Sequence, residues 1–325
     1  MACEFYGISI TRYENMKKVL IRILGMIMLL TACTGIHSTI PQLAVSTTTL
    51  LPPTKPATAT QTFTPAPTFT STATPTASPT PTATWVVQGP GDVTVPILLY
   101  HRIDTSPIDS RYYVTPEKFE AQLKLLHEWE YTTITTRMLV QAITQGAELP
   151  PHPLLITFDD GHLDNYATAF PIMQKYGFTG VLYIVYNYID ADQYMNADQI
   201  LEMHNAGWEV GSHSLNHLDL TKLDDDKKRA EIVESRDLLQ ELLGIPIETF
   251  AYPFGTKDAA ALDYAKFAGY IGAMGASGYT PAQGEWNLFY LQRVEIKGTE
   301  DAKTFTRFLP WQGDPVFLPT DTPVP

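Results

Sequence analysis

Short apolar runs alternate with longer amphipathic stretches between Val95 and Ile296, which leaves few architectures open to this chain. The runs are VPILLY, YTTIT, PLLITF, TGVLYIV, WEVGS, IETFAY, YIGAM and LFYLQRVEI, at residues 95–100, 131–135, 153–158, 179–185, 208–212, 247–252, 270–274 and 288–296. Near-continuous apolar strands separated by helices are typical of a parallel sheet covered by helices. The pattern predicts an α/β fold with seven or eight units, closed or nearly closed as a (β/α) barrel. A flat doubly wound sheet is the alternative.

Two of the amphipathic stretches carry clear helix signals. Residues 116–130 follow Thr115, a good N-cap, and begin with Pro116, which suits the first helical position. Residues 224–244 end at Gly244, which suits a helix C-terminus. We expect a helix over each stretch.

The N-terminal segment has the pattern of a targeting sequence. From Met16 to Cys33 the chain has basic residues ahead of a short apolar stretch, which is a secretory signal pattern, and we expect translation to begin at Met16. The stretch ends in LTAC, which resembles the lipobox of bacterial lipoproteins. Residues 1–33 are therefore predicted to be a signal peptide, with Cys33 lipidated and the protein anchored to the outer face of a bacterial membrane, on the extracellular side.

Composition sets the domain boundaries. Of the 39 residues from Ser46 to Thr84, 27 are Thr, Ser or Pro, a composition that cannot bury enough apolar surface to fold. We expect residues 34–90 to be a disordered tether, 91–300 the folded domain and 301–325 a C-terminal tail.

After residue 84 the chain holds 17 basic and 33 acidic residues, a net charge of −16, which argues against nucleic acid as a partner. No obligate protein partner is evident.

Several polar residues follow directly on predicted strands. His101 follows the first run, Asp159 and Asp160 follow PLLITF, and His213 and His217 follow WEVGS. In a barrel the carboxyl ends of the strands gather at one face, where the chemistry lies. The five residues therefore predict a single site.

The segment HSLNH places two histidines four residues apart, and a helical turn there would bring both imidazoles to one face. Two imidazoles and one carboxylate form a three-ligand site for a divalent metal ion, with Zn expected and Co, Ni or Fe as alternatives, and with positions open for water. A second carboxylate beside the ion can accept the proton of that water. A zinc peptidase is disfavoured because Ser214 stands where the His-Glu-x-x-His motif has its glutamate.

At these residues the chain resembles a known family. TFDDG and HSLNH are similar to the first two motifs of the polysaccharide deacetylases, the NodB-homology domains of carbohydrate esterase family four, over residues 93–297. The resemblance implies a deformed (β/α) barrel of about seven strands. It also implies that Asp159 is the catalytic base and that Asp160, His213 and His217 are the metal ligands.

The chain also departs from the family pattern. In FAYPFG, Ala251 and Phe254 stand where the third motif has arginine and tyrosine, and no histidine follows His217. Deacetylases of extracellular β-1,6-linked poly-N-acetylglucosamine resemble this chain in VPILLYHRI and FAYPFG. That resemblance implies that His101 is the general acid, and we expect Arg293 to replace the missing arginine that orients the base.

The implied reaction is the metal-dependent hydrolysis of acetyl groups on an extracellular polysaccharide. N-acetylglucosamine polymers are the expected substrate, with peptidoglycan, chitin oligomers and acetylated xylan also open. A surface lipoprotein that binds glycans with a decayed site is the alternative. His162 is expected to be a solvent-facing loop residue, with a place at the rim of the site as the alternative.

Overall fold

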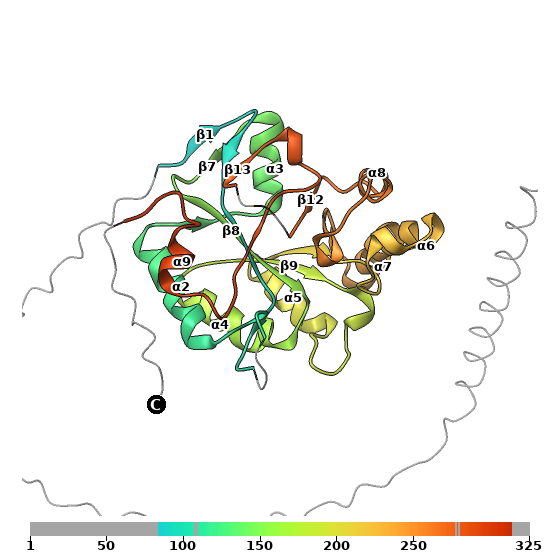
Figure 1. Ribbon diagram of the computed structural model, residues 1–325, viewed down its shortest axis with the longest axis horizontal. Helices are drawn as coiled ribbons and strands as arrows, with labels where there is room; N and C mark the ends of the chain where they lie inside the picture. Colours follow the sequence, from blue (N-terminus) through green and yellow to red (C-terminus); the bar gives the residue numbers. More distant parts are fainter. Residues whose placement is uncertain (1–83, 107–109, 277, 279, 314–325) are drawn as a thin grey trace, which may run out of the picture. The chain divides into compact units, whose positions relative to one another are not determined.

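The central sheet of the computed structural model consists of parallel strands; the structure describes residues 84–106, 110–276, 278 and 280–313. Seven strands lie side by side in it: β3 (Ile97–Tyr100), β8 (Pro153–Asp160), β9 (Val181–Ile184), β10 (Glu209–Ser212), β11 (Thr249–Ala251), β12 (Gly272–Met274) and β14 (Val294–Glu295). An eighth, β6 (Thr132–Thr133), pairs in parallel with β8 outside this row. The seven lie in the order β12-β11-β10-β9-β8-β3-β14, and each neighbouring pair is parallel (Figure 1). The predicted α/β fold with about seven parallel strands is confirmed.

The two ends of this sheet are joined by the chain that leads into β14. Leu291 pairs in parallel with Met274 of β12, and its carbonyl accepts a 2.9 Å hydrogen bond from the amide of Gly275. Three residues later, Val294 of β14 pairs with Leu98 of β3. One short segment therefore contacts both edges, so the sheet curves into a deformed barrel and is not a flat doubly wound sheet.

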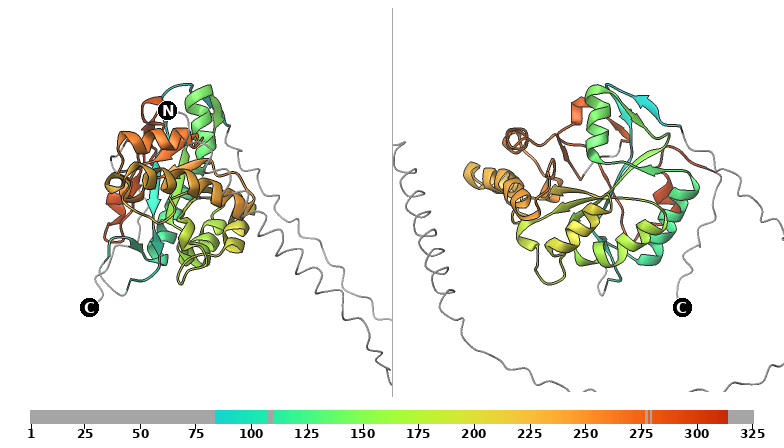
Figure 2. Two further views of the ribbon diagram at one scale, coloured as in Figure 1. Left: turned by 90° about the vertical axis from the view of Figure 1, so that its right-hand side faces the viewer. Right: turned by 180° about the vertical axis from the view of Figure 1, so that it is seen from behind.

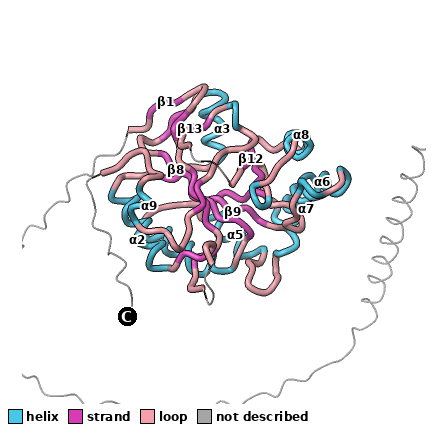
Figure 3. The backbone as a smooth tube through the Cα atoms, in the orientation of Figure 1, coloured by secondary structure: helices cyan, strands magenta, loops and turns pink. Residues whose placement is uncertain are grey.

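Helices surround the strands, as Figures 1 and 3 show, and Figure 2 gives the same arrangement from the side and from behind. The α-helices are α2 (Pro116–Glu128), α3 (Thr136–Gln145), α4 (Phe170–Lys175), α5 (Ala197–Asn205), α6 (Asp225–Arg229), α7 (Ser235–Leu243), α8 (Ala259–Phe267) and α9 (Ala302–Thr306). Two π-helical turns are η1 (Asn165–Ala169) and η4 (Ala230–Glu234), and the 3-10 turns are η2 (Tyr186–Tyr188), η3 (Leu220–Lys222), η5 (Pro253–Gly255) and η6 (Glu285–Asn287). The remaining strands are β1 (Val86–Gln88), β2 (Val93–Thr94), β4 (Arg102–Ile103), β5 (Tyr113–Val114), β7 (Ala147–Leu149) and β13 (Ala282–Gln283).

The predicted helix signals are present. The hydroxyl of Thr115 accepts from the amide of Lys118, and Pro116 begins α2. Gly244 ends α7 with φ of 67°, a left-handed conformation that glycine adopts without strain. The predicted helix over 224–244 is not continuous, however, because the π turn η4 separates α6 from α7.

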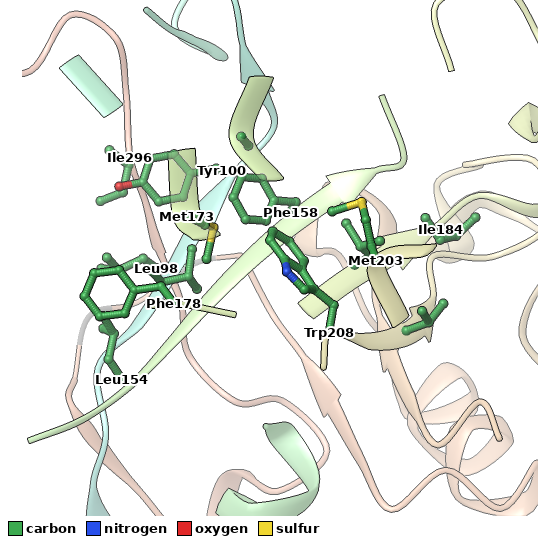
Figure 4. Close-up of a cluster of buried hydrophobic side chains, with 14 of the residues drawn as sticks. Leu98, Tyr100, Leu154, Phe158, Met173, Phe178, Ile184, Met203, Trp208 and Ile296 are labelled. Atoms are coloured by element: carbon green, nitrogen blue, oxygen red, sulfur yellow. The ribbon is translucent and has the colours of Figure 1, made fainter. Parts of the chain in front are cut away.

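Large aromatic side chains fill the space between β8 and the helices (Figure 4). Phe158 of β8 stacks on Tyr100 at 5.6 Å and lies 5.4 Å from Trp208, between ring centroids. Gly180 leaves room for this indole, since a Cβ there would lie 2.6 Å from Trp208. The strand that carries both aspartates is thus fixed from the outside by a dry aromatic core.

The folded region extends past both predicted boundaries. Strand β1, which the sequence assigned to the tether, pairs antiparallel with β7. In the predicted tail, Phe305 of α9 is 1% exposed and Leu309 is 2% exposed. The first extension is held by backbone pairing, with Val86 and Val87 exposed, and the second by two buried apolar side chains. In both cases the partners lie far away in the chain, so local composition did not reveal them.

The predictions for residues 1–83 lie outside the described residues. These are the signal peptide, the lipidated Cys33 and the tether up to that point. Within the part of the chain that the structure describes, no helix has the length and apolar character needed to cross a membrane.

Candidate active site

An open pocket of about 640 Å³ lies where the carboxyl ends of the central strands meet. It is lined by Leu99, His101, Arg102, Arg111, Tyr112, Tyr113, Asp159, Asp160, His162, His213, His217, Phe254, Gly255, Ala276 and Glu295. The five polar residues that follow predicted strands are all among them. The structure thus brings together side chains from β3, β8 and β10, as expected for a barrel.

The two adjacent aspartates reach the same pocket because the backbone changes conformation between them. Neighbouring side chains on a strand point to opposite faces. Asp160 leaves the extended conformation with φ of 74°, and Gly161 follows with φ of 83°. This left-handed turn at the end of β8 brings Asp160 to the side that Asp159 already faces.

The HSLNH segment is not helical, contrary to the prediction. It is an irregular loop after β10 in which Ser214 and His217 have φ of 73° and 55°. The loop is fixed by hydrogen bonds: the amide of His217 donates to the hydroxyl of Ser214 at 3.0 Å. The two imidazole rings nevertheless lie 4.9 Å apart between centroids, so the loop achieves the proximity that a helical turn was expected to give.

A buried glutamate of η4 organises this loop. Glu231, 3% exposed, accepts hydrogen bonds from the amides of Leu215 and Asn216 at 3.0 and 2.9 Å, and from the side-chain amide of Asn216 at 2.6 Å. Ser235, one turn later, lies 2.8 Å from Ser212 between hydroxyl oxygens. The loop that carries both histidines is therefore supported by the helix beneath it.

Asp160, His213 and His217 form a cluster suited to a metal ion. One atom from each lies within 4.8 Å of the others. Oδ1 of Asp160 is 3.6 Å from Nε2 of His213 and 3.3 Å from Nε2 of His217, and this buried oxygen has no hydrogen-bond partner among the described residues. Nδ1 of His213 lies 2.7 Å from the carbonyl of Ala251, to which it donates, so the lone pair on Nε2 is directed into the cluster. Two imidazoles and a carboxylate are a donor set that fits zinc and related divalent ions.

Electrostatics keep these groups in the forms that bind cations. Burial alone would raise the pKa of Asp160, but a hydrogen bond from His162 and the nearby His213 outweigh it and hold the pKa well below its ordinary value. Burial lowers the pKa of His213, which favours the neutral ring. Ionised carboxylates and neutral imidazoles are the forms that a metal ion requires.

Asp159 forms a bidentate ion pair with Arg293. Nη1 and Nη2 of Arg293 each donate to one carboxylate oxygen at 2.7 Å. Both side chains are buried, and Arg293 also donates to the carbonyl of Gly275 and the hydroxyl of Thr157. Burial would raise the pKa of Asp159, but Arg293 and His213 reverse this, so the net shift is downward. The contact expected for Arg293 is present, 134 residues away from Asp159 in sequence.

His101 lines the pocket at the end of β3. Its ring packs edge-on against Tyr112 with 4.9 Å between centroids, and its buried Nδ1 has no hydrogen-bond partner within the described ranges. Burial lowers the pKa of His101, although Asp159 and Asp160 oppose the shift. A protonated His101 is therefore a stronger acid than an exposed histidine.

His162 was expected to face solvent, and the structure corrects this. Its side chain is 12% exposed, and Nε2 lies 3.3 Å from Oδ2 of Asp160. The ring stacks on Tyr194 at 4.8 Å between centroids. The left-handed turn at Gly161 folds the residue back over the site, and such a turn cannot be inferred from the polar character of the segment.

Further pocket residues were not predicted. Arg102 pairs with Asp164 and donates to the hydroxyl of Tyr113 at 3.1 Å, while Glu295 lies 3.6 Å from Arg111. One signal was available for Glu295. It stands two residues after Arg293 on the last strand, and a period of two puts both side chains on one face.

Phe254, at the tyrosine position of the third motif, also borders the cluster. It has φ of 59° in η5 and is 62% exposed. Its ring centroid lies 4.6 Å from that of His217. The residue thus presents both an aromatic face and a sharply turned backbone at the mouth of the pocket.

Together, the fold and this pocket define an α/β barrel with its chemical groups at the carboxyl ends of its strands. The family model described as polysaccharide deacetylase matches residues 146–273. With YxkH of Bacillus subtilis, named as a candidate polysaccharide deacetylase, the chain is 28% identical over 216 residues, which cover 66% of this chain and 76% of YxkH. With a poly-beta-1,6-N-acetyl-D-glucosamine N-deacetylase of Staphylococcus aureus it is 27% identical over 201 residues, covering 57% of this chain and 68% of that enzyme.

A solved structure of a polysaccharide deacetylase has a similar fold. BC0361, a polysaccharide deacetylase from Bacillus cereus, superposes with a TM-score of 0.60 at 27% identity, covering 67% of this chain and 69% of BC0361. Over residues 146–273 the chain is therefore similar to the polysaccharide deacetylases. The matched range 146–273 includes both aspartates, His213 and His217 but neither His101 nor Arg293, so roles for these two rest on the geometry of this pocket.

Proposed function

We propose that this chain hydrolyses acetyl groups of an extracellular polysaccharide in a metal-dependent reaction, with N-acetylglucosamine polymers as substrate. The observation that carries the proposal is the arrangement of Asp159, paired with Arg293, beside the cluster of Asp160, His213 and His217. A ligand cluster and a separate base in one pocket are what hydrolysis of an amide requires. The name of the Staphylococcus aureus relative supports the choice of polymer.

Each residue has a distinct task in this proposal. Asp160, His213 and His217 would hold the divalent ion, which supplies Lewis acidity toward the acetyl carbonyl and lowers the pKa of a water molecule. Asp159 accepts the proton of the attacking water. Its Oδ2 is the atom for this step, because it lies 3.7 Å from Nε2 of His213 and so faces the cluster.

Departure of the leaving group requires a proton donor. His101 donates a proton to the amine as the carbon–nitrogen bond breaks, so that acetate and a free amino sugar result. Its lowered pKa makes the imidazolium a better donor. The backbone amide of Phe254 stabilises the developing oxyanion, a role suited to the turned backbone of η5.

Metal removal is the direct test of the proposal. We expect the full chain to release acetate from poly-N-acetylglucosamine, to lose this activity with a chelator, and to recover it when Zn²⁺, Co²⁺, Ni²⁺ or Fe²⁺ is restored, since the ligand set accepts each of them. Released acetate is measured for a panel that includes chitin oligomers, peptidoglycan and acetylated xylan. Binding of glycan without acetate release under any metal would instead support a binding protein.

Replacing His101 by alanine tests the acid role. We expect turnover on an amide substrate to fall about 10²–10⁴-fold, because the amine would leave unprotonated. An activated ester, whose leaving group needs no proton, is expected to be much less affected. Metal content serves as the control and should be unchanged. Equal losses on amide and ester would remove His101 from this role.

A further inference from the structure

The two oxygens of the Asp160 carboxylate face different groups. Oδ1 points toward the imidazoles of His213 and His217, at 3.6 and 3.3 Å, and has no hydrogen-bond partner in the part of the chain that the structure describes. Oδ2 lies 3.3 Å from Nε2 of His162. One oxygen therefore faces a protein nitrogen, while the other is left for a cation.

The ring of His162 is itself fixed in place. It stacks on Tyr194 at 4.8 Å with 26° between the planes, and the backbones of the two residues pair in an antiparallel bridge. Tyr188 packs against Tyr194 at 4.7 Å, and its centroid lies 6.5 Å from the ring of His217. A row of rings, His162, Tyr194 and Tyr188, thus runs from the turn that carries Asp160 to the loop that carries His217.

The hydrogen-bonding pattern of His162 defines its tautomer. Nδ1 is buried and has no acceptor or donor partner among the described residues. A proton on that atom would be a buried donor without an acceptor, which is costly. The tautomer with its proton on Nε2, 3.3 Å from Oδ2 of Asp160, avoids this cost.

We propose that His162 is a positioning residue that makes Asp160 bind the metal ion through a single oxygen. Rotation of an aspartate carboxylate about χ2 is soft, so without a partner for Oδ2 the group is free to offer both oxygens or to turn away. His162 removes this freedom by holding Oδ2. The inference rests on the proposed function, because the ion is part of that proposal. Outer partners of this kind change metal affinity about 10–100-fold.

The test is metal binding by the full chain, measured apart from activity. His162→Phe keeps a ring to stack on Tyr194 but has no donor, and His162→Gln keeps a side-chain N–H donor. Dissociation constants for Zn²⁺ and Co²⁺ are measured by competition with a chelator, and the visible spectrum of the Co²⁺ form is recorded. We expect His162→Phe to weaken binding about 10–100-fold and to alter the spectrum, and His162→Gln to restore most of the affinity. His127→Phe, an exposed histidine of α2 outside the pocket, should match the parent.

The outcomes separate this inference from the proposed function. Equal metal affinity and equal spectra for His162→Phe and the parent would overturn the positioning role. So would a variant that keeps its metal but loses turnover on amides alone, because that result makes His162 a proton donor. A parent chain that binds no metal would overturn the proposed function first. If His162→Phe does not fold, His162→Leu, which also lacks a donor, undergoes the same measurements.

Discussion

Replacing Asp159 by asparagine is expected to lower turnover about 10²–10⁴-fold on amide and activated ester substrates alike, since the base acts on the attacking water that both reactions share. Metal binding should persist, because the proposed ligands are Asp160, His213 and His217. This combination distinguishes the base from a ligand and from the general acid. Initial rates on both substrates and metal content per chain are the measurements.

The matched control is Asp263→Asn, an exposed aspartate of α8 that does not line the pocket. It should have the rates and metal content of the parent. Loss of metal in Asp159→Asn would place this carboxylate among the ligands. Retained ester hydrolysis would show that the water loses its proton to another group.

Arg293→Met is expected to destabilise the fold by about 3–5 kcal/mol, because it leaves a buried carboxylate without its partner. Asp159 is 3% exposed and loses two 2.7 Å charge-assisted hydrogen bonds at once. Arg293→Lys keeps the charge but not the two-pronged geometry, so its loss should be smaller. The free energy of unfolding is obtained from urea denaturation.

Arg307→Met is the control, since Arg307 is exposed and lies over the ring of Phe308 on the surface. We expect a change of less than about 0.5 kcal/mol there. A second variant, Asp159→Leu with Arg293→Met, removes both charges and should recover part of the lost stability. A fold as stable with Arg293→Met as with arginine would mean that the pair contributes nothing to the core.

The approximate number and the parallel direction of the central strands could be predicted because both follow from local pattern. Runs such as 153–158 and 179–185 are apolar on both faces, which only a covered parallel sheet permits. Closure of the sheet into a barrel could be predicted, but the residues at which its two ends meet could not. It depends on Leu291 reaching Met274, a pairing between short strands that no periodicity reveals.

The site residues could be located from their positions after strands, while their orientation could not. The spacing of His213 and His217 predicted proximity, but through a helical turn that does not form. Asp160 and Ser214 have left-handed backbones that their residue types do not require. Such conformations are imposed by the surrounding hydrogen bonds, which become visible only once distant segments have met.

His162 is a residue whose environment the local sequence did not reveal. A histidine after glycine in a polar stretch has the local pattern of a surface loop, and only the structure shows that its side chain is 12% exposed and contacts Tyr194 and Asp160. Arg293 was found because the family resemblance left an orienting contact unfilled. No feature of the last strand by itself pointed to Asp159.

The number of residues in the π turn η4 determines which side chains of η4 and α7 face the loop 212–216. Glu231 lies within the turn and Ser235 directly follows it, and both contact the segment 212–216. Deleting one residue between them would rotate α7 by about 100° relative to α6, so one of the two contacts would leave the loop. An insertion or deletion in this helix is therefore expected to disturb the loop that carries His213 and His217, although no residue of η4 or α7 lines the pocket.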